Sequence, residues 1–259
     1  REGVGAMAVS AVDVALWDLK ARLLGVSLAD LLGRFRDAVP VYGSGGFTSL
    51  SDPELHEQLA GWRDLGRVKL KVGREPERDP ERLRVARDAV GDEVELMVDA
   101  NGAFRPKEAL AWAERYADFG IVYFEEPVSS DDLDGLRLVR DRGPAGMAIA
   151  AGEYAWDLPE LRELAGCVDV LQADVTRCGG ITNMLRVDGI CKARGLPFSA
   201  HCAPSISAHV CAAMECAVHI EYFADHVRAE RQLFEGALEP VGGALRPDAE
   251  RPGLGLELR

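Results

Sequence analysis

The sequence is poor in lysine although it is rich in positive charge. Only five of its 30 basic residues are lysines, and two of them, Lys69 and Lys71, lie in the segment RVKLKVG (67–73). If this segment is a strand, both ammonium groups point to one face, where like charges repel. Because a crowded lysine can lose its proton and arginine cannot, this pair indicates a functional use. The alternative is an edge strand whose lysines face water and prevent edge-to-edge pairing.

Long apolar runs and a positive net charge are also lacking. No apolar run approaches the ~20 residues of a membrane span, and the net charge of −13 argues against nucleic acid and anionic membranes as partners. The first residues, REGVGAMAVS, do not form the continuous apolar segment of a signal peptide. We therefore expect a cytoplasmic protein. The sequence also lacks an initial methionine, so we expect it to begin inside a longer chain.

No two cysteines have the CxxC spacing of a metal or redox motif. The six cysteines occupy mostly apolar segments, at positions 167, 178, 191, 202, 211 and 216. We predict that they are small buried hydrophobic residues, and neither disulfides nor zinc ligands.

What the sequence does contain is a repeated alternation of short apolar runs and amphipathic stretches. Seven runs are predicted to be strands, with a weaker eighth, and they cover residues 39–46, 67–73, 93–102, 121–127, 147–153, 168–174, 196–202 and 219–226. Helical patterns separate them, for example at 52–66, 79–91, 105–120 and 181–195, and an apolar helix is predicted first, at 8–25. Strands separated by helices indicate a parallel sheet.

The number of repeats favours a closed sheet over an open one. Seven or eight units in 259 residues fit an α/β fold of the TIM type, a (β/α)7β barrel preceded by a packing helix. We predict one domain over residues 1–259, with a leading helix segment at 1–38, the barrel at 39–235 and a C-terminal tail at 236–259. A doubly wound sheet is the alternative, but SGGFTSLSD after the first strand has neither usual phosphate-binding pattern.

Ionisable residues gather where the predicted strands end. Asp99, Glu125 and Glu153 are one strand step apart, and the strand ends of a parallel barrel surround one mouth. Three converging carboxylates repel each other unless a hard cation such as Mg²⁺ joins them. The alternative is that each carboxylate caps the following helix.

A second pair has the same spacing. Asp174 and His201 also end neighbouring predicted strands, so the carboxylate could fix the imidazole tautomer and raise its basicity. The other four histidines have no such setting and are predicted to be surface or packing residues.

Six short motifs occur in order at these strand ends. They are KLK, DAN, FEEP, AGE, QAD with CGGIT behind it, and SAHCAP. Together they resemble the catalytic barrel of the enolase superfamily, specifically its mandelate racemase subgroup, over nearly the whole chain. The use of a lysine or histidine base with Mg²⁺ is a known feature of that superfamily.

The resemblance implies a role for each of these residues. It implies Asp99, Glu125 and Glu153 as Mg²⁺ ligands, Lys71 as one base, and His201 oriented by Asp174 as the base or acid on the opposite face. It also implies substrate contacts, from Ser44, Lys69, Asn101 and Glu221. The muconate-lactonising and dipeptide-epimerising relatives carry lysine at the position of Asp174 and favour aspartate at the position of Glu153. Both differences favour the racemase-type subgroup for this chain. Members of the family also carry an N-terminal capping domain, which we expect to be absent from this chain.

The implied chemistry is removal of the proton α to a carboxylate, through a metal-stabilised enediolate. Repulsion by Lys69, the metal charge and burial are all expected to lower the pKa of Lys71. The leading hypothesis is dehydration of an acid sugar by a lyase, with His201 as general acid. The alternatives are a racemase or epimerase of a 2-hydroxy acid, and a non-catalytic barrel without its cap. We expect a small hydroxy-carboxylate as substrate and a homo-oligomer.

Overall fold

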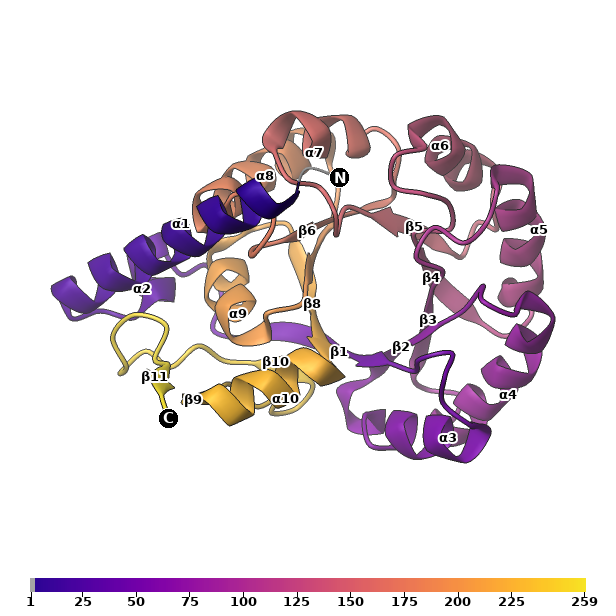
Figure 1. Ribbon diagram of the computed structural model, residues 1–259, viewed down its shortest axis with the longest axis horizontal. Coiled ribbons are helices and arrows are strands. Elements are labelled where there is room, and N and C mark those ends of the chain that lie inside the picture. Colours follow the sequence, from indigo (N-terminus) through magenta and orange to yellow (C-terminus); the bar gives the residue numbers. More distant parts are fainter. Residues whose placement is uncertain (1–2) are drawn as a thin grey trace. The chain divides into compact units, whose positions relative to one another are not determined.

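A computed structural model describes residues 3–259 and divides them into two compact units. The described part of unit 1 comprises residues 3–41, 152–165 and 171–259, and unit 2 comprises residues 42–151 and 166–170. Strands and helices alternate along both units, as the sequence predicted (Figure 1).

Unit 2 contains a parallel sheet of consecutive strands. These strands are the end of β1 (Val39–Gly45), β2 (Arg67–Lys71), β3 (Glu95–Asp99), β4 (Ile121–Glu125) and β5 (Ala148–Ala151). Strand β2 pairs with β1 on one side and β3 on the other, so the edge-strand interpretation of RVKLKVG was wrong. The register sets Lys71 opposite Asp99, and Asp99 opposite Glu125.

Helices cover the outer face of this sheet (Figure 1). They are α3 (Asp52–Ala60), α4 (Asp79–Val90), α5 (Pro106–Ala117) and α6 (Leu133–Arg142), with short 3₁₀ turns η1 (Arg63–Leu65) and η2 (Pro76–Arg78). Helix α5 shows why these segments form. Pro106 begins it, the Glu108 carboxylate accepts a hydrogen bond from the Arg105 N–H, and Trp112 and Tyr116 lie one turn apart on its buried face.

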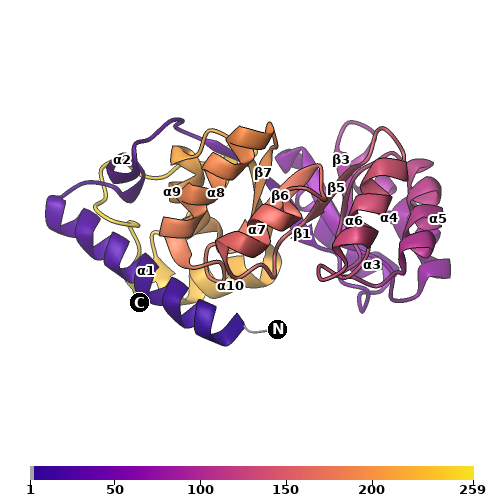
Figure 2. The same cartoon turned by 90° about the horizontal axis from the view of Figure 1, so that it is seen from above.

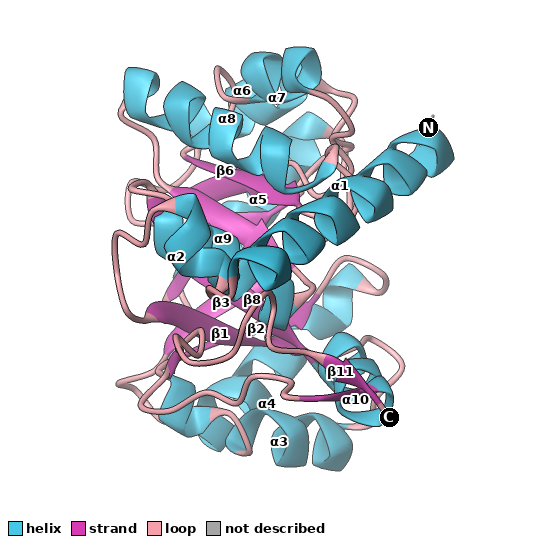
Figure 3. Cartoon of the chain, turned by 90° about the vertical axis from the view of Figure 1, so that its left-hand side faces the viewer, coloured by secondary structure: helices cyan, strands magenta, loops and turns pink. Residues whose placement is uncertain are grey.

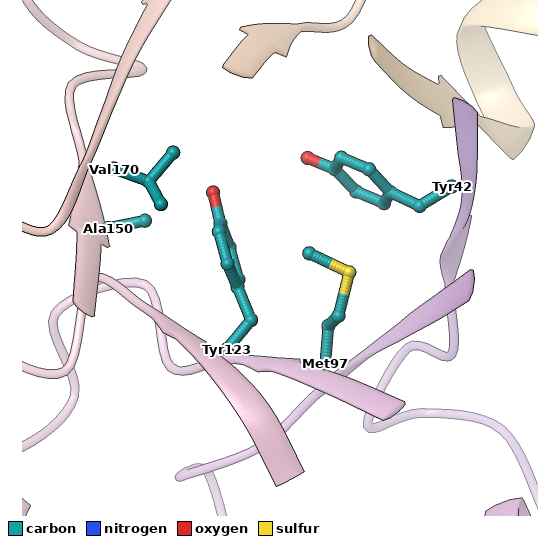
Figure 4. Packing of buried hydrophobic residues seen from close by; sticks show 5 residues of the cluster. All are labelled: Tyr42, Met97, Tyr123, Ala150 and Val170. Atoms are coloured by element: carbon teal, nitrogen blue, oxygen red, sulfur yellow. The ribbon is translucent and has the colours of Figure 1, made fainter. Parts of the chain in front are cut away.

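The inner face of unit 2 is filled by an apolar cluster. It consists of Tyr42, Met97, Tyr123, Ala150 and Val170, whose side chains converge from neighbouring strands (Figure 4). Because strand side chains alternate, Met97 shares a face with Asp99, and Tyr123 shares one with Glu125. The cluster therefore packs directly beside the carboxylates and fixes the strands that hold them.

Unit 1 contains the remaining parallel strands. β6 (Val170–Asp174) pairs with β7 (Phe198–His201), which pairs with β8 (Ala217–Phe223), and Asp174 stands opposite His201 in the register. The helices of this unit are α7 (Leu158–Leu164), α8 (Gly180–Arg194), α9 (Pro204–Ala213) and α10 (Ala224–Leu233).

The ends of the chain also lie in unit 1. Helix α1 (Gly3–Leu24) packs along α8 and is followed by α2 (Leu28–Leu32) (Figure 2). The Trp17 indole donates to Thr182 Oγ1 over 2.9 Å and ties α1 to α8. The tail forms the short strands β9 (Phe234–Glu235), β10 (Ala244–Leu245) and β11 (Glu257–Leu258), the last of which lies near the C-terminus (Figure 3). The Leu254 N–H donates to Asp18 Oδ1 on α1 over 2.6 Å. Among residues 3–259, no helix combines the length and apolar character needed to span a bilayer.

Several predicted boundaries were wrong by a few residues. The weak eighth strand was predicted at 219–226, but β8 begins at Ala217, and residues 224–226 already belong to α10. The predicted helix at 52–66 is divided at Gly61, where α3 gives way to a 3₁₀ turn. The expectation for the cysteines as thiols is confirmed, because all six are free and five are buried.

Candidate active site

Both lysines of β2 contact buried carboxylates in unit 2. Lys69 is fully buried, and its ammonium nitrogen lies 2.5 Å from Glu125 Oε2 and 3.6 Å from Asp99 Oδ2. Lys71 is more accessible and forms an ion pair with the same Asp99 oxygen. The two ammonium groups therefore face carboxylates of the neighbouring strands, which offsets their mutual repulsion and the cost of burial.

Asp99 is held by the backbone as well as by the lysines. The Asn101 N–H donates to Asp99 Oδ1 over 2.8 Å, and Asn101 adopts a left-handed conformation with φ of 45°. Asparagine tolerates that conformation better than most residues, which explains its place in the DAN motif. The carboxylate thus stays at the strand end, and does not cap α5, whose N-terminal cap is Arg105.

The donor set of unit 2 suits a hard divalent cation. Asp99 and Glu125 are both completely buried, and they offer carboxylate oxygens within 4.8 Å of one another. Mg²⁺ prefers oxygen ligands, and a cation there would share the two carboxylates with the ammonium groups of Lys69 and Lys71.

Glu153 lies in the loop after β5, directly after Gly152. Gly152 has φ of 137°, and a Cβ at this position would lie 2.0 Å from the backbone oxygen of Gln172 in β6. Only glycine permits this close approach of the two segments. The glycine of the AGE motif therefore determines where the Glu153 carboxylate can lie.

His201 and Asp174 form the hydrogen-bonded pair that the sequence predicted. His201 Nδ1 lies 2.7 Å from Asp174 Oδ2, while the N–H and the hydroxyl of Thr176 both donate to Asp174 Oδ1 over 2.7 Å. An ionised Asp174 accepts the Nδ1 proton, and this leaves Nε2 as the reactive nitrogen. Burial opposes ionisation of Asp174, but the hydrogen bonds from His201 and Thr176 and the charges of His201 and Arg177 together outweigh it and lower the pKa of the carboxyl group.

Three side chains surround the reactive nitrogen of His201. Nε2 lies 3.1 Å from Glu153 Oε2, 3.4 Å from Glu221 Oε2 and 3.4 Å from Cys202 Sγ. Burial disfavours the imidazolium, but Glu221, Cys202 and Glu153 together raise the pKa of His201 well above its usual value. A protonated His201 can donate a proton to a leaving group, which is the role of a general acid.

Two neighbours of this pair were missed by the sequence analysis. Arg177 Nη1 donates to the Glu153 backbone oxygen over 3.1 Å, and its Nε lies 3.5 Å from Asp174 Oδ2. Cys202 follows His201 in SAHCAP and has φ of 49°. Burial and the nearby Glu221 carboxylate raise the pKa of its thiol to about 12. The only feature of the sequence that could have indicated Arg177 and Cys202 is that each stands next to a residue of a motif, Cys178 and His201 respectively.

The other predicted substrate contacts lie where their strands end. Ser44 on β1 is buried and stands opposite Lys69 in the register, and Glu221 is buried on β8. Asn101 is exposed in the loop after β3. Unit 2 thus brings together Ser44, Lys69, Lys71, Asp99 and Glu125, and unit 1 brings together Glu153, Asp174, His201 and Glu221.

Comparisons with known proteins identify the family. Residues 54–259 match the sequence model described as "Enolase C-terminal domain-like", and residues 3–33 match the N-terminal domain of mandelate racemase / muconate lactonizing enzyme. L-talarate/galactarate dehydratase from Salmonella typhimurium is 33% identical over all of this chain. The chain spans 65% of the length of that relative.

Solved structures agree with the sequence relatives. A mandelate racemase/muconate lactonizing enzyme-like protein from Rubrobacter xylanophilus has a TM-score of 0.97 and 69% identity, over 99% of this chain and 72% of its own. The structure of the Salmonella typhimurium dehydratase liganded with Mg and L-lyxarohydroxamate has a TM-score of 0.90 and 32% identity, over 99% of this chain and 66% of its own.

The chain therefore belongs to the mandelate racemase and muconate lactonizing enzyme family of the enolase superfamily, as its six motifs predicted. Its fold is the TIM-type α/β barrel of this family, with a leading helix. The doubly wound alternative was wrong.

Proposed function

We propose that the protein is a Mg²⁺-dependent lyase that dehydrates an acid sugar. The observation that carries this proposal is the His201–Asp174 pair, in which a buried carboxylate binds Nδ1, so that Nε2 is the nitrogen that can serve as an acid. It is supported by the similarity to L-talarate/galactarate dehydratase, whose structure contains Mg and a hydroxamate ligand.

In a parallel barrel such as that of this family, the carboxyl ends of all strands surround the same mouth. Every proposed residue stands within two residues of such a strand end. Residues 39–235 would form this barrel, with 1–38 leading into it and 236–259 following it, within a single domain. Asp99, Glu125 and Glu153 would then hold the cation. Mg²⁺ would neutralise the negative charge that develops on the substrate carboxylate as the α-proton leaves.

Two groups would move protons. Lys71, at the accessible end of β2, would take the α-proton. Its ion pair with Asp99 favours the ammonium form, and a cation bound to Asp99 would weaken that pair and so favour the neutral amine. His201 donates Nε2–H to the departing β-hydroxyl, and Asp174 holds the imidazole in position.

The remaining residues would position the substrate. Buried Lys69 and Ser44 would orient its carboxylate, while Asn101 and Glu221 would contact its hydroxyl groups. A small hydroxy-carboxylate is the expected partner. We also expect a cytoplasmic homo-oligomer.

Racemisation of a 2-hydroxy acid is the second candidate. The specific observation in its favour is that the chain carries two distinct bases, Lys71 and His201, as a two-base reaction on opposite faces of one carbon requires. In this reaction His201 returns a proton to the same carbon, and no hydroxyl group leaves.

One experiment separates these functions. The protein is incubated with Mg²⁺ and a panel of aldonic and aldaric acids in D₂O, and the products are followed by NMR. A 2-keto product supports dehydration, whereas deuterium at the α-carbon without keto product supports racemisation. Lys71→Ala and His201→Ala should abolish either reaction, while Lys107→Ala and His56→Ala, at exposed positions, serve as matched controls. If all four variants kept wild-type activity, the assigned site would be wrong. If the wild-type protein turned over no acid in the panel, the non-catalytic alternative would be favoured.

A further inference from the structure

The side of His201 that faces β8 carries a second set of potential metal ligands. His201 Nε2, Cys202 Sγ and Glu221 Oε2 come from the end of β7 and from β8, and all three residues are buried. Each atom lies close to the other two: Nε2 to Sγ is 3.4 Å, Sγ to Oε2 is 3.2 Å, and Nε2 to Oε2 is 3.4 Å. One nitrogen, one sulfur and one oxygen therefore form a nearly equilateral triangle.

This triangle has the size of one face of a zinc tetrahedron. With zinc bonds of about 2.0–2.3 Å, these separations give ligand–zinc–ligand angles of roughly 90–110°. Once Nε2 has lost its proton the ring tautomer suits the role, because Asp174 accepts the Nδ1 proton over 2.7 Å and the lone pair lies on Nε2, which also stands 3.1 Å from Glu153 Oε2. A carboxylate that supports a ligating histidine in this way is a common feature of zinc sites.

The thiol distinguishes this triangle from the carboxylates proposed for Mg²⁺. Mg²⁺ prefers octahedral oxygen ligands, whereas zinc and other borderline or soft cations accept sulfur and nitrogen. The backbone holds Cys202 in place, because the Cys202 N–H donates to Glu221 Oε2 over 3.2 Å and the Ser207 hydroxyl donates to the Cys202 backbone oxygen over 2.9 Å.

We propose that His201, Cys202 and Glu221 form a binding site for a thiophilic divalent cation such as Zn²⁺, distinct from the Mg²⁺ site. Binding releases the Cys202 thiol proton and the Nε2 proton of a protonated His201 to solvent, and the cation takes the Nε2 lone pair. Three protein ligands leave the fourth position open for water. The consequence, which rests on the proposed function, is that a bound zinc ion inhibits the enzyme by withdrawing His201 from proton transfer.

Co²⁺ is the probe for the binding step, since it replaces zinc in tetrahedral sites and its spectrum reports a thiolate ligand. The wild-type protein, with Mg²⁺ in excess, should bind one Co²⁺ and show thiolate-to-metal charge-transfer absorption that added Zn²⁺ abolishes. Cys202→Ser should lose this absorption and bind Zn²⁺ at least about tenfold more weakly, since even the loss of a residue that only supports a ligand costs roughly 10–100-fold in affinity. Cys216→Ser is the matched control, because Cys216 is the most exposed of the cysteines, and this variant should behave as wild type.

Three results would overturn the proposal. They are a wild-type protein without charge-transfer absorption, absorption that persists in Cys202→Ser, and a Co²⁺ signal that rising Mg²⁺ removes in proportion to its occupancy of the carboxylate site. Because the wild-type spectrum by itself reports a thiolate ligand, the proposal can be tested even if the Cys202 variant does not fold.

Inhibition is measured separately as the rate with Zn²⁺ relative to the same variant without it. Zn²⁺ should inhibit wild type and Cys216→Ser at concentrations at least about tenfold below those needed for Cys202→Ser. A protein that binds Co²⁺ through Cys202 but turns over no acid sugar would refute the proposed function and leave the metal site intact. An active enzyme without the spectral signal would refute only the metal site.

Discussion

His209 should make the stability of the protein depend on pH. It lies inside α9, almost completely buried, where its Nδ1 accepts a hydrogen bond from the Ala29 N–H over 3.2 Å. Burial lowers its pKa from 6.5 to about 4. The unfolded chain therefore binds more protons than the folded chain between these two values, so stability is lost as the pH falls through this window.

The magnitude follows from the size of the shift. One pKa unit corresponds to about 1.4 kcal/mol, so lowering the pH from 7.5 to 5 should remove about 2 kcal/mol of unfolding free energy through this residue alone. His209→Asn replaces the imidazole by an amide that does not titrate and whose oxygen can still accept from Ala29. This variant should be less stable at pH 7.5 but should lose about 2 kcal/mol less on acidification.

Urea unfolding, followed by circular dichroism at several pH values, measures this difference. Other groups titrate in the same range, so the informative quantity is the wild-type profile minus the variant profile. His56→Asn, at an exposed position, is the control and should leave the wild-type profile unchanged. A difference profile for His209→Asn that stays flat between pH 7.5 and 5 would contradict a lowered pKa of His209 in the folded protein.

Three further predictions concern the site. Gly152→Ala should destabilise the protein by roughly 1–3 kcal/mol and lower kcat, because its Cβ meets the Gln172 oxygen; an unchanged melting temperature would contradict the close approach. Asp174→Asn should lower kcat by about 100-fold or more with little change in KM, because an amide no longer fixes the imidazole tautomer; a loss confined to KM would argue against that role. Millimolar Mg²⁺ should raise the melting temperature of the wild type but not of Asp99→Asn, since a ligand that binds only the folded state stabilises it; equal shifts in both proteins would place the cation elsewhere.

Much of the site could be predicted because the reacting groups stand on strands. A strand alternates its side chains strictly, and parallel strands place their carboxyl ends at one edge, so Asp99 and Glu125 could be placed together from spacing alone. The pairing of Asp174 with His201 followed from the same rule and is confirmed at 2.7 Å.

The parts of the site that could not be predicted depend on contacts between side chains of neighbouring strands. Cys202, just after β7, and Glu221, on β8, are 19 residues apart, and the register of these two strands contains an irregularity, so no sequence spacing indicates that their atoms meet at 3.2 Å. The absence of CxxC spacing excluded a local cysteine motif, but it could not exclude ligands from two strands. The early start of β8 was missed because its first residues follow α9 without a turn signal such as glycine or proline.

The register of Lys71, Asp99 and Glu125 across three strands has a consequence for how such an enzyme can change. The residues whose side chains would perform the reaction are paired through their backbones in the sheet of unit 2. Changing the arrangement of these side chains would therefore mean changing the sheet itself. The loops that follow the strands are not constrained by pairing in the sheet. Mutations in the loops can therefore change which substrate is bound while the proton transfer stays the same. A family with this strand arrangement can diversify widely in its substrates but only narrowly in its reaction.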